Sequence, residues 1–243
     1  MHPIIYKIGP LTIYSYGVML AAAVFLCTFL LQKESKKTSL NLSADGIFDL
    51  VFWVVVSGII GSRIFFIFLN FSDFAENPLE IFMVQHGGLA WQGGLIAGSL
   101  TLIFLLKKKR LPIWEALDVL APYAALGQAI GRIGCFLNGC CYGREVWWGI
   151  YFPVHQARLH PTQLYDALGL LFIFVLLKKF QTFKKRHGEI TLLYFLLAAG
   201  LRFTVEFFRA DHAIVFLGLS IFQIISLGII TMALYAYLRI KSR

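Results

Sequence analysis

Apolar runs of about 20 residues recur along the whole of this 243-residue chain, and each run is long enough to cross a bilayer as a helix. Hydrophobic residues make up 58% of the chain and charged residues 14%, with a mean hydropathy of +0.74, whereas soluble domains contain about 25% charged residues. The sequence therefore predicts an all-α integral membrane protein, a seven-transmembrane-helix bundle in which residues 1–243 form a single transmembrane domain. The spans are predicted at roughly 13–32, 46–69, 89–106, 113–136, 162–179, 189–208 and 216–238.

The positive charges predict how this bundle is oriented. Fifteen Lys and Arg residues fall in segments that would share one face of the membrane, and four fall in segments on the other face. Because cytoplasmic segments collect Lys and Arg, the N-terminus is predicted outside and the C-terminus in the cytoplasm. The net charge of +9 then reflects topology and attraction to anionic membrane lipids, and the chain lacks a basic soluble face for nucleic acid. The longest polar interruption, 137–161, is rich in aromatic residues and predicts a segment at the outer interface.

Three arginines interrupt the apolar runs: Arg63, Arg132 and Arg202. A charged side chain at a helix centre costs about 3 kcal/mol, so such residues usually face a polar cavity. The sequence offers no equal number of buried acids, which indicates an anion from outside the protein. At membrane depth that anion is predicted to be a lipid phosphate, because the guanidinium fork binds phosphate through two parallel hydrogen bonds. Glu206 follows Arg202 by four residues on one helical face. It either forms a structural ion pair or orients the arginine toward phosphate.

A glycine-rich segment, residues 86–94 (HGGLAWQGG), lies at the outer start of the third apolar run. It is either an unwound wall of a pocket, which we favour, or a site of close helix packing through glycine. His86 and Gln92 are its polar candidates, and His86 has the ordinary pKa of a base near neutral pH. Gly58 and Gly61 lie shortly before Arg63, and this spacing predicts close helix packing. The second interpretation is a phosphate contact at Arg63.

Residues 160–166 (HPTQLYD) open the fifth apolar run. Gln163 and Tyr165 are predicted to line a cavity as hydrogen-bond donors, although a polar helix start can also be a simple cap. Tyr16, in the first run, is either a substrate contact or an interfacial anchor. Three of the four cysteines form a Cys-x4-Cys-Cys pattern at Cys135, Cys140 and Cys141. Because the histidines are scattered, we expect packing rather than a metal site, and no cofactor.

Four motifs in this order resemble those of the bacterial prolipoprotein diacylglyceryl transferases. They are residues 87–96 (GGLAWQGGLI), 131–138 (GRIGCFLN, with Gly143 after it), 160–165 (HPTQLY) and 202–209 (RFTVEFFR). The resemblance covers nearly the whole chain. It implies transfer of the diacylglyceryl group from phosphatidylglycerol to the lipobox cysteine of a preprolipoprotein signal peptide. A thioether would form and glycerol 1-phosphate would leave, in the bacterial cytoplasmic (inner) membrane. This is the first step of lipoprotein maturation.

The resemblance also implies roles for individual residues. Arg132, Arg202 and Glu206 would be catalytic, and substrate contacts would come from Tyr16, Asn138 and Gly143. Many family members differ from this chain at Gln92 (histidine), Cys135 (asparagine), Cys140 (glutamate) and Ala198 (tyrosine). Either His86 replaces the missing histidine as the base, or the reaction needs no base at that position. A diverged paralogue with altered activity is an alternative. A lipid transporter or flippase is another, although the paired broken helices of transporters are not evident.

Overall fold

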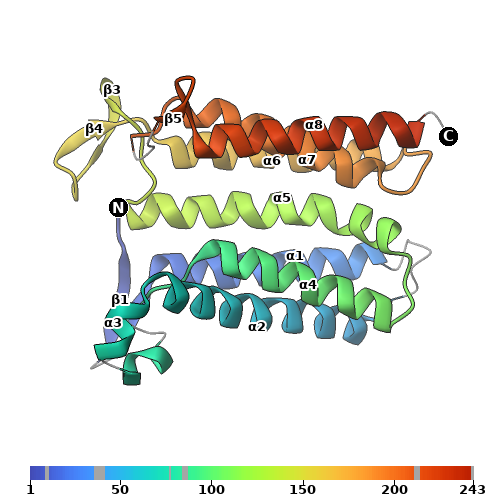
Figure 1. Cartoon of the computed structure of the whole chain (residues 1–243), viewed down its shortest axis with the longest axis horizontal. Coiled ribbons are helices and arrows are strands. Elements are labelled where there is room, and N and C mark those ends of the chain that lie inside the picture. The colour runs from blue at the N-terminus through green and yellow to red at the C-terminus, as the bar shows by residue number, and fades with distance from the viewer. Residues whose placement is uncertain (9–10, 36–41, 77, 84–86, 211–213, 242–243) are drawn as a thin grey trace. The chain divides into compact units, whose positions relative to one another are not determined.

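The computed structural model describes residues 1–8, 11–35, 42–76, 78–83, 87–210 and 214–241, most of which are helical (Figure 1). Seven of the described helices have at least 18 residues, and each overlaps one of the predicted apolar runs. They are α1 (Ser15–Ser35), α2 (Ala44–Leu69), α4 (Trp91–Lys108), α5 (Ile113–Asn138), α6 (Thr162–Gln181), α7 (Glu189–Glu206) and α8 (Ile221–Lys241). Two short helices, α3 (Phe71–Glu76) and the 3₁₀ helix η1 (Pro78–Phe82), follow α2.

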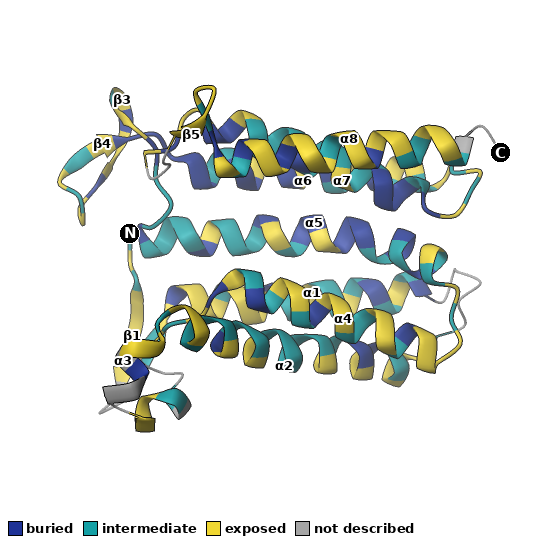
Figure 2. Ribbon diagram, viewed as in Figure 1, coloured by how far each residue is buried: buried dark blue, intermediate teal, exposed yellow. Residues whose placement is uncertain are grey.

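Three of the described helices are long and apolar enough to cross a membrane by length and composition. They are α1, α2 and Ile221–Ile240 of α8, with mean hydropathies of 1.8, 2.2 and 1.9. Large apolar side chains remain exposed on all three, among them Phe25, Phe68 and Met232. Figure 2 shows how exposed positions recur along α2 and α8. Because exposed apolar surface of this extent is unfavourable in water and favourable in lipid, the chain is a membrane protein.

Three antiparallel hairpins accompany the helices and were not foreseen in the all-α prediction. They pair β1 (Ile4–Ile8) with β2 (Leu11–Tyr14), β3 (Glu145–Phe152) with β4 (Ala157–Leu159), and β5 (Ile214–Phe216) with β6 (Leu219–Ser220). In the last hairpin, Leu217 and Gly218 have φ values of 49° and 76°, as a two-residue turn with positive φ at both central positions requires. The strands are short, so they leave little alternation of polar and apolar residues to read in the sequence.

The chain forms two compact units, which are described separately: Met1–Leu31 with Leu117–Arg243, and Gln32–Ala116. In the first unit, α5, α6 and α7 share a core built from Ala121, Ala125, Ile173, Leu177 and Ile190. α8 packs along α7. α1 packs along α5, where the Cys27 thiol donates to the Tyr123 carbonyl oxygen at 3.4 Å.

In the second unit, α2 and α4 pack backbone to backbone. A Cβ atom on Gly93 would lie 2.2 Å from the Gly61 carbonyl oxygen, and one on Gly94 would lie 2.4 Å from the Ser62 hydroxyl oxygen. The prediction of an unwound wall is therefore wrong for residues 91–94, which are helical, because glycines let the two helices touch. Residues 87–90, just before α4, are non-helical, and His86 lies outside the described residues.

A buried carboxylate, Asp118 of α5, caps the start of α7. It accepts hydrogen bonds from the Gly188 amide at 2.7 Å, the Thr191 amide at 2.9 Å and the Thr191 hydroxyl at 2.8 Å, and it pairs with Lys184 at 3.4 Å. Gly188, the residue before α7, has φ 98° and no side chain with which to cap the helix. Asp118 thus supplies from another helix the acceptor that an N-cap residue normally provides. Its negative charge also interacts favourably with the helix dipole at the start of α7.

We expect Asp118→Ala to lower the free energy of unfolding by about 3 to 5 kcal/mol, because it leaves buried donors and a lysine without their partner. Asp49→Ala is the matched control, since the Asp49 side chain is 61% exposed and pairs with Lys109 at 3.6 Å. That exposed pair is worth less than about 1 kcal/mol. Unfolding of both variants in detergent measures the difference, and equal losses would contradict the capping role.

Candidate anion-binding site

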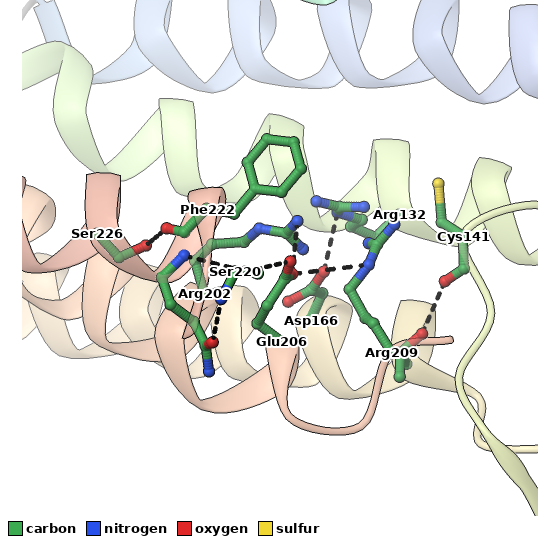
Figure 3. A network of polar contacts seen from close by, with 11 residues as sticks. Arg132, Cys141, Asp166, Arg202, Glu206, Arg209, Ser220, Phe222 and Ser226 are labelled. Carbon is green, nitrogen blue, oxygen red and sulfur yellow. Dashed lines mark hydrogen bonds and ion pairs between the residues drawn. The ribbon is translucent and has the colours of Figure 1, made fainter. Parts of the chain in front are cut away.

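Charged side chains gather at one end of the first unit, where four helix termini meet. Consecutive helices of this unit run in alternating directions, so the ends of α5 and α7 lie beside the starts of α6 and α8 (Figure 1). Arg132 comes from the end of α5, Asp166 from the start of α6, and Arg202 and Glu206 from the end of α7. Figure 3 shows these side chains and Arg209 converging on one another.

Two buried carboxylates hold three arginines at this point. Arg132 Nε lies 3.2 Å from Asp166 Oδ2, and Arg202 Nη2 lies 2.8 Å from Glu206 Oε2. Arg209 Nε approaches the same Glu206 oxygen at 3.7 Å. The Asp166 and Glu206 side chains are only 4% and 1% exposed. Three guanidinium groups against two carboxylates leave one formal positive charge in excess, so the cluster is suited to an anion.

The cluster keeps one buried donor without a hydrogen-bond partner among the described residues. Arg202 Nη1 is buried and has no hydrogen-bond partner among the described residues, while the guanidinium also lies 5.0 Å from the centre of the Phe222 ring. Asp166 Oδ2 and Glu206 Oε2 approach their arginines at ion-pair distance but without hydrogen-bond alignment. A buried donor without an acceptor is costly, so Arg202 Nη1 indicates a position for an external acceptor.

The start of α8 orients Glu206. Ser220 donates its hydroxyl to Glu206 Oε1 at 2.9 Å. The same hydroxyl oxygen accepts from the Gln223 amide at 3.3 Å, and Gln223 Oε1 accepts from the Ser220 amide at 2.9 Å. This is a capping box, and it fixes Ser220 beside the carboxylate. The sequence analysis missed both residues, although Ser-x-x-Gln before an apolar run is the recognised signal for a helix start.

The loop between α5 and β3 is fastened to the start of α6. Gln163 donates its side-chain amide to the Cys140 carbonyl oxygen at 2.5 Å, and the Thr162 hydroxyl donates to the Cys141 carbonyl oxygen at 2.7 Å. Gln163 is fully buried and its Oε1 atom has no described partner. In the same loop the Gly143 amide donates to the His160 carbonyl oxygen at 2.9 Å. The loop backbone therefore uses the Gln163 donor, and its role in lining a cavity stays a prediction.

His160, Tyr165 and Trp148 form an aromatic group beside this loop. The Tyr165 hydroxyl and His160 Nδ1 are 3.0 Å apart, and the His160 ring packs edge-on against Trp148 at 4.8 Å between ring centres. Burial lowers the pKa of His160, so its imidazole is neutral at neutral pH. The Tyr165 hydroxyl is therefore hydrogen-bonded to a neutral imidazole ring.

The first unit brings together most of the site residues expected from the sequence. Arg132, Arg202, Glu206, Gln163 and Gly143 lie as described above, Asn138 is the last residue of α5, and the Tyr16 ring lies against Gly134. The sequence did not indicate that Asp166 is the partner of Arg132.

Two further candidates, Arg63 and Gln92, belong to the second unit. Arg63 is buried and donates to the carbonyl oxygens of Ile81 at 3.2 Å, Gly87 at 2.6 Å and Gly88 at 3.0 Å. Arg63 thus binds backbone carbonyl oxygens of its own unit. Its role as a phosphate ligand stays a prediction. Gln92 lies in the first turn of α4. His86, the candidate base, lies outside the described residues.

Comparison with known proteins gives consistent matches along the whole chain. Residues 3–239 match the family described as prolipoprotein diacylglyceryl transferase. Relatives named phosphatidylglycerol–prolipoprotein diacylglyceryl transferase include those of Finegoldia magna (34% identical, covering 100% of this chain and 97% of the relative) and Idiomarina loihiensis (35%, 99% and 94%). A third, from Trichormus variabilis, is 33% identical over 99% of this chain and 91% of its own length.

We expect Gly143→Ala to destabilise the folded protein, because the added Cβ would lie 2.4 Å from the Phe208 carbonyl oxygen and 2.5 Å from His160 Cβ. Gly228→Ala on α8 is the matched control, since its Cβ would meet no described atom within 4 Å. In a helix that change is neutral or gains up to about 1 kcal/mol. Folded yield and thermal unfolding in detergent report both effects, and a tolerated Gly143→Ala would show that the loop can move away.

Proposed function

The chain belongs to the prolipoprotein diacylglyceryl transferase family, and we propose that it transfers the diacylglyceryl group of phosphatidylglycerol to the lipobox cysteine of a preprolipoprotein. The observation that carries this proposal is the arginine cluster, with its excess positive charge and the unpartnered Arg202 Nη1. A phosphate group supplies both the negative charge and the acceptor oxygens that this cluster lacks.

The reaction is a displacement at carbon. The cysteine sulfur attacks the glycerol carbon that bears the phosphate oxygen, and the carbon–oxygen bond breaks as the carbon–sulfur bond forms. The thiol proton passes to a base such as His86, to water or to the lipid phosphate. The products are a thioether and glycerol 1-phosphate. Negative charge accumulates on the leaving phosphate, so donors already in position around it lower the barrier. Arg132 and Arg202 fill this role in our proposal.

In each of these arginines a carboxylate holds one nitrogen, and part of the side chain is exposed. Asp166 holds Arg132 through Nε, and Glu206 holds Arg202 through Nη2. Of the two side chains, that of Arg132 is 27% exposed and that of Arg202 is 23% exposed, so a phosphate can approach them. Glu206 acts here by positioning Arg202. In the first unit, substrate contacts are proposed for Tyr16, Asn138, Gly143, Gln163 and Tyr165. In the second unit, Arg63 and Gln92 are proposed separately as substrate contacts, and His86 stays a candidate base.

We place the protein in the bacterial inner membrane with seven spans, the N-terminus outside and the C-terminus in the cytoplasm. Support comes from the seven long helices and from lysines in the last turns of α4 and α6. In α6 these lysines lie at the opposite end from Asp166, so the arginine cluster falls on the outer side. Both substrates are anchored in the bilayer, and their reacting groups would enter from the membrane side.

We expect Arg132→Lys to reduce diacylglyceryl transfer by about 100-fold or more, the cost of removing a preorganised donor, because lysine cannot form the two-pronged contact. Arg158→Lys on β4 is the matched control, since Arg158 is exposed and outside the cluster. Transfer of labelled diacylglyceryl from phosphatidylglycerol vesicles to a lipobox peptide measures both variants. Equal activity in the two would contradict the phosphate-binding role of Arg132.

The function as a whole is tested in cells. A bacterial strain depleted of its own transferase should regain lipoprotein maturation when it expresses this chain. Failure of a well-expressed, membrane-inserted wild-type chain would contradict the proposed activity and favour a diverged paralogue.

The proposed orientation predicts opposite labelling of two tryptophan positions. Trp148→Cys should react with a membrane-impermeant thiol reagent added outside, and Trp114→Cys at the start of α5 should react only after the cytoplasmic face is opened. Both tryptophans are exposed, so accessibility does not distinguish them. The unsubstituted chain gives the background from its own cysteines. The reverse pattern would place the arginine cluster on the cytoplasmic side.

A further inference from the structure

Three of the four cysteines come together next to the arginine cluster. The Sγ atoms of Cys135, Cys140 and Cys141 all lie within 4.8 Å of one another. Cys135 is in the last turn of α5, and the other two follow in the loop that leads to β3. The scattered histidines of the sequence predict no metal site here, but thiolates alone can form a ligand set for soft cations.

The backbone holds the three thiols in this arrangement. After α5 the chain turns back through Gly139 at φ 76° and Cys141 at φ 61°. A non-glycine residue with such a φ is uncommon and needs support from its surroundings. The buried Gln163 and Thr162 give that support by donating to the carbonyl oxygens of Cys140 and Cys141. These bonds fix the backbone from which the Cys140 and Cys141 side chains project.

We propose that Cys135, Cys140 and Cys141 bind one soft divalent d¹⁰ cation of the Zn²⁺ class through three thiolates. Zinc–sulfur bonds of about 2.3 Å place the sulfur atoms about 3.8 to 4.0 Å apart, so the cluster closes on the ion by small side-chain movements. Three sulfur–metal bonds form, and the thiols release their protons to solvent. The fourth coordination position is left to water.

The charge balance favours this complex. Three thiolates and a divalent cation carry a net charge of −1, which suits a site beside guanidinium groups. Arg209 and Arg132 are the cations that interact electrostatically with Cys141. The obvious competitor is a disulfide, which requires a two-electron oxidant, joins only two of the three sulfurs and leaves the third as a free thiol.

The test is a Zn²⁺ titration of the full-length protein, reduced and kept anaerobic in detergent, against a chromophoric chelator. We expect one Zn²⁺ per chain. Cys135→Ser, Cys140→Ser and Cys141→Ser should each weaken binding at least about 10-fold, the loss that follows even from removal of an outer-shell group. Cys27→Ser is the matched control and should bind as the wild type does, because Cys27 lies on α1 with its thiol on the Tyr123 carbonyl oxygen.

A second measurement needs no variant. Bound Zn²⁺ should reduce the number of rapidly alkylated thiols, counted by mass spectrometry, by three. No Zn²⁺ binding by the reduced wild type, or equal affinity in the Cys135→Ser and Cys27→Ser variants, would overturn the proposal. Two rather than four thiols in protein purified anaerobically without reductant and then denatured would also overturn it, in favour of a disulfide. Transfer activity is not a readout, so these results are independent of the proposed function.

Discussion

The arrangement at the charged end of the first unit depends on the interactions of one buried carboxylate, that of Glu206. It pairs with Arg202 and Arg209 and accepts from Ser220, so one side chain joins the end of α7, the turn that follows it and the start of α8. A carboxylate this deeply buried is stable only with such partners. Because these partners come from different elements, Glu206 fixes both the helix ends and the arginines of the proposed phosphate site.

Buried carboxylates hold α7 at both ends. Asp118 of α5 caps its first turn, and Glu206 closes its last. In a membrane the apolar faces of helices gain little from association, since lipid is equally apolar. Polar contacts at the helix ends then define the register of α7 against α5 and α8, while small apolar contacts such as those around Ala125 and Ile173 fill the space between. The positions of Arg202 and Glu206 relative to Arg132 follow from that register.

The loop after α5 carries two features that depend on its backbone conformation. Its backbone carries Gly143, where no larger residue fits, and its thiols form the proposed metal site beside Arg132 and Arg209. Gln163 and Thr162 hold the backbone that both features require. The start of α6 therefore supplies both the residues that hold this loop and Asp166, the partner of Arg132.

The sequence by itself determined the long helices, the membrane character, the unusual arginines and the resemblance to a transferase family, because helix length, hydropathy and short motifs are local properties. It could also place Arg202 and Glu206 on one helical face, four residues apart. Only the tertiary structure decided that Asp166 pairs with Arg132, that Ser220 reaches Glu206 and that three thiols meet. It also decided that Gly93 and Gly94 pack against α2 rather than unwind. These features depend on which side chains of different elements meet, and that is set by packing geometry rather than by spacing along the chain.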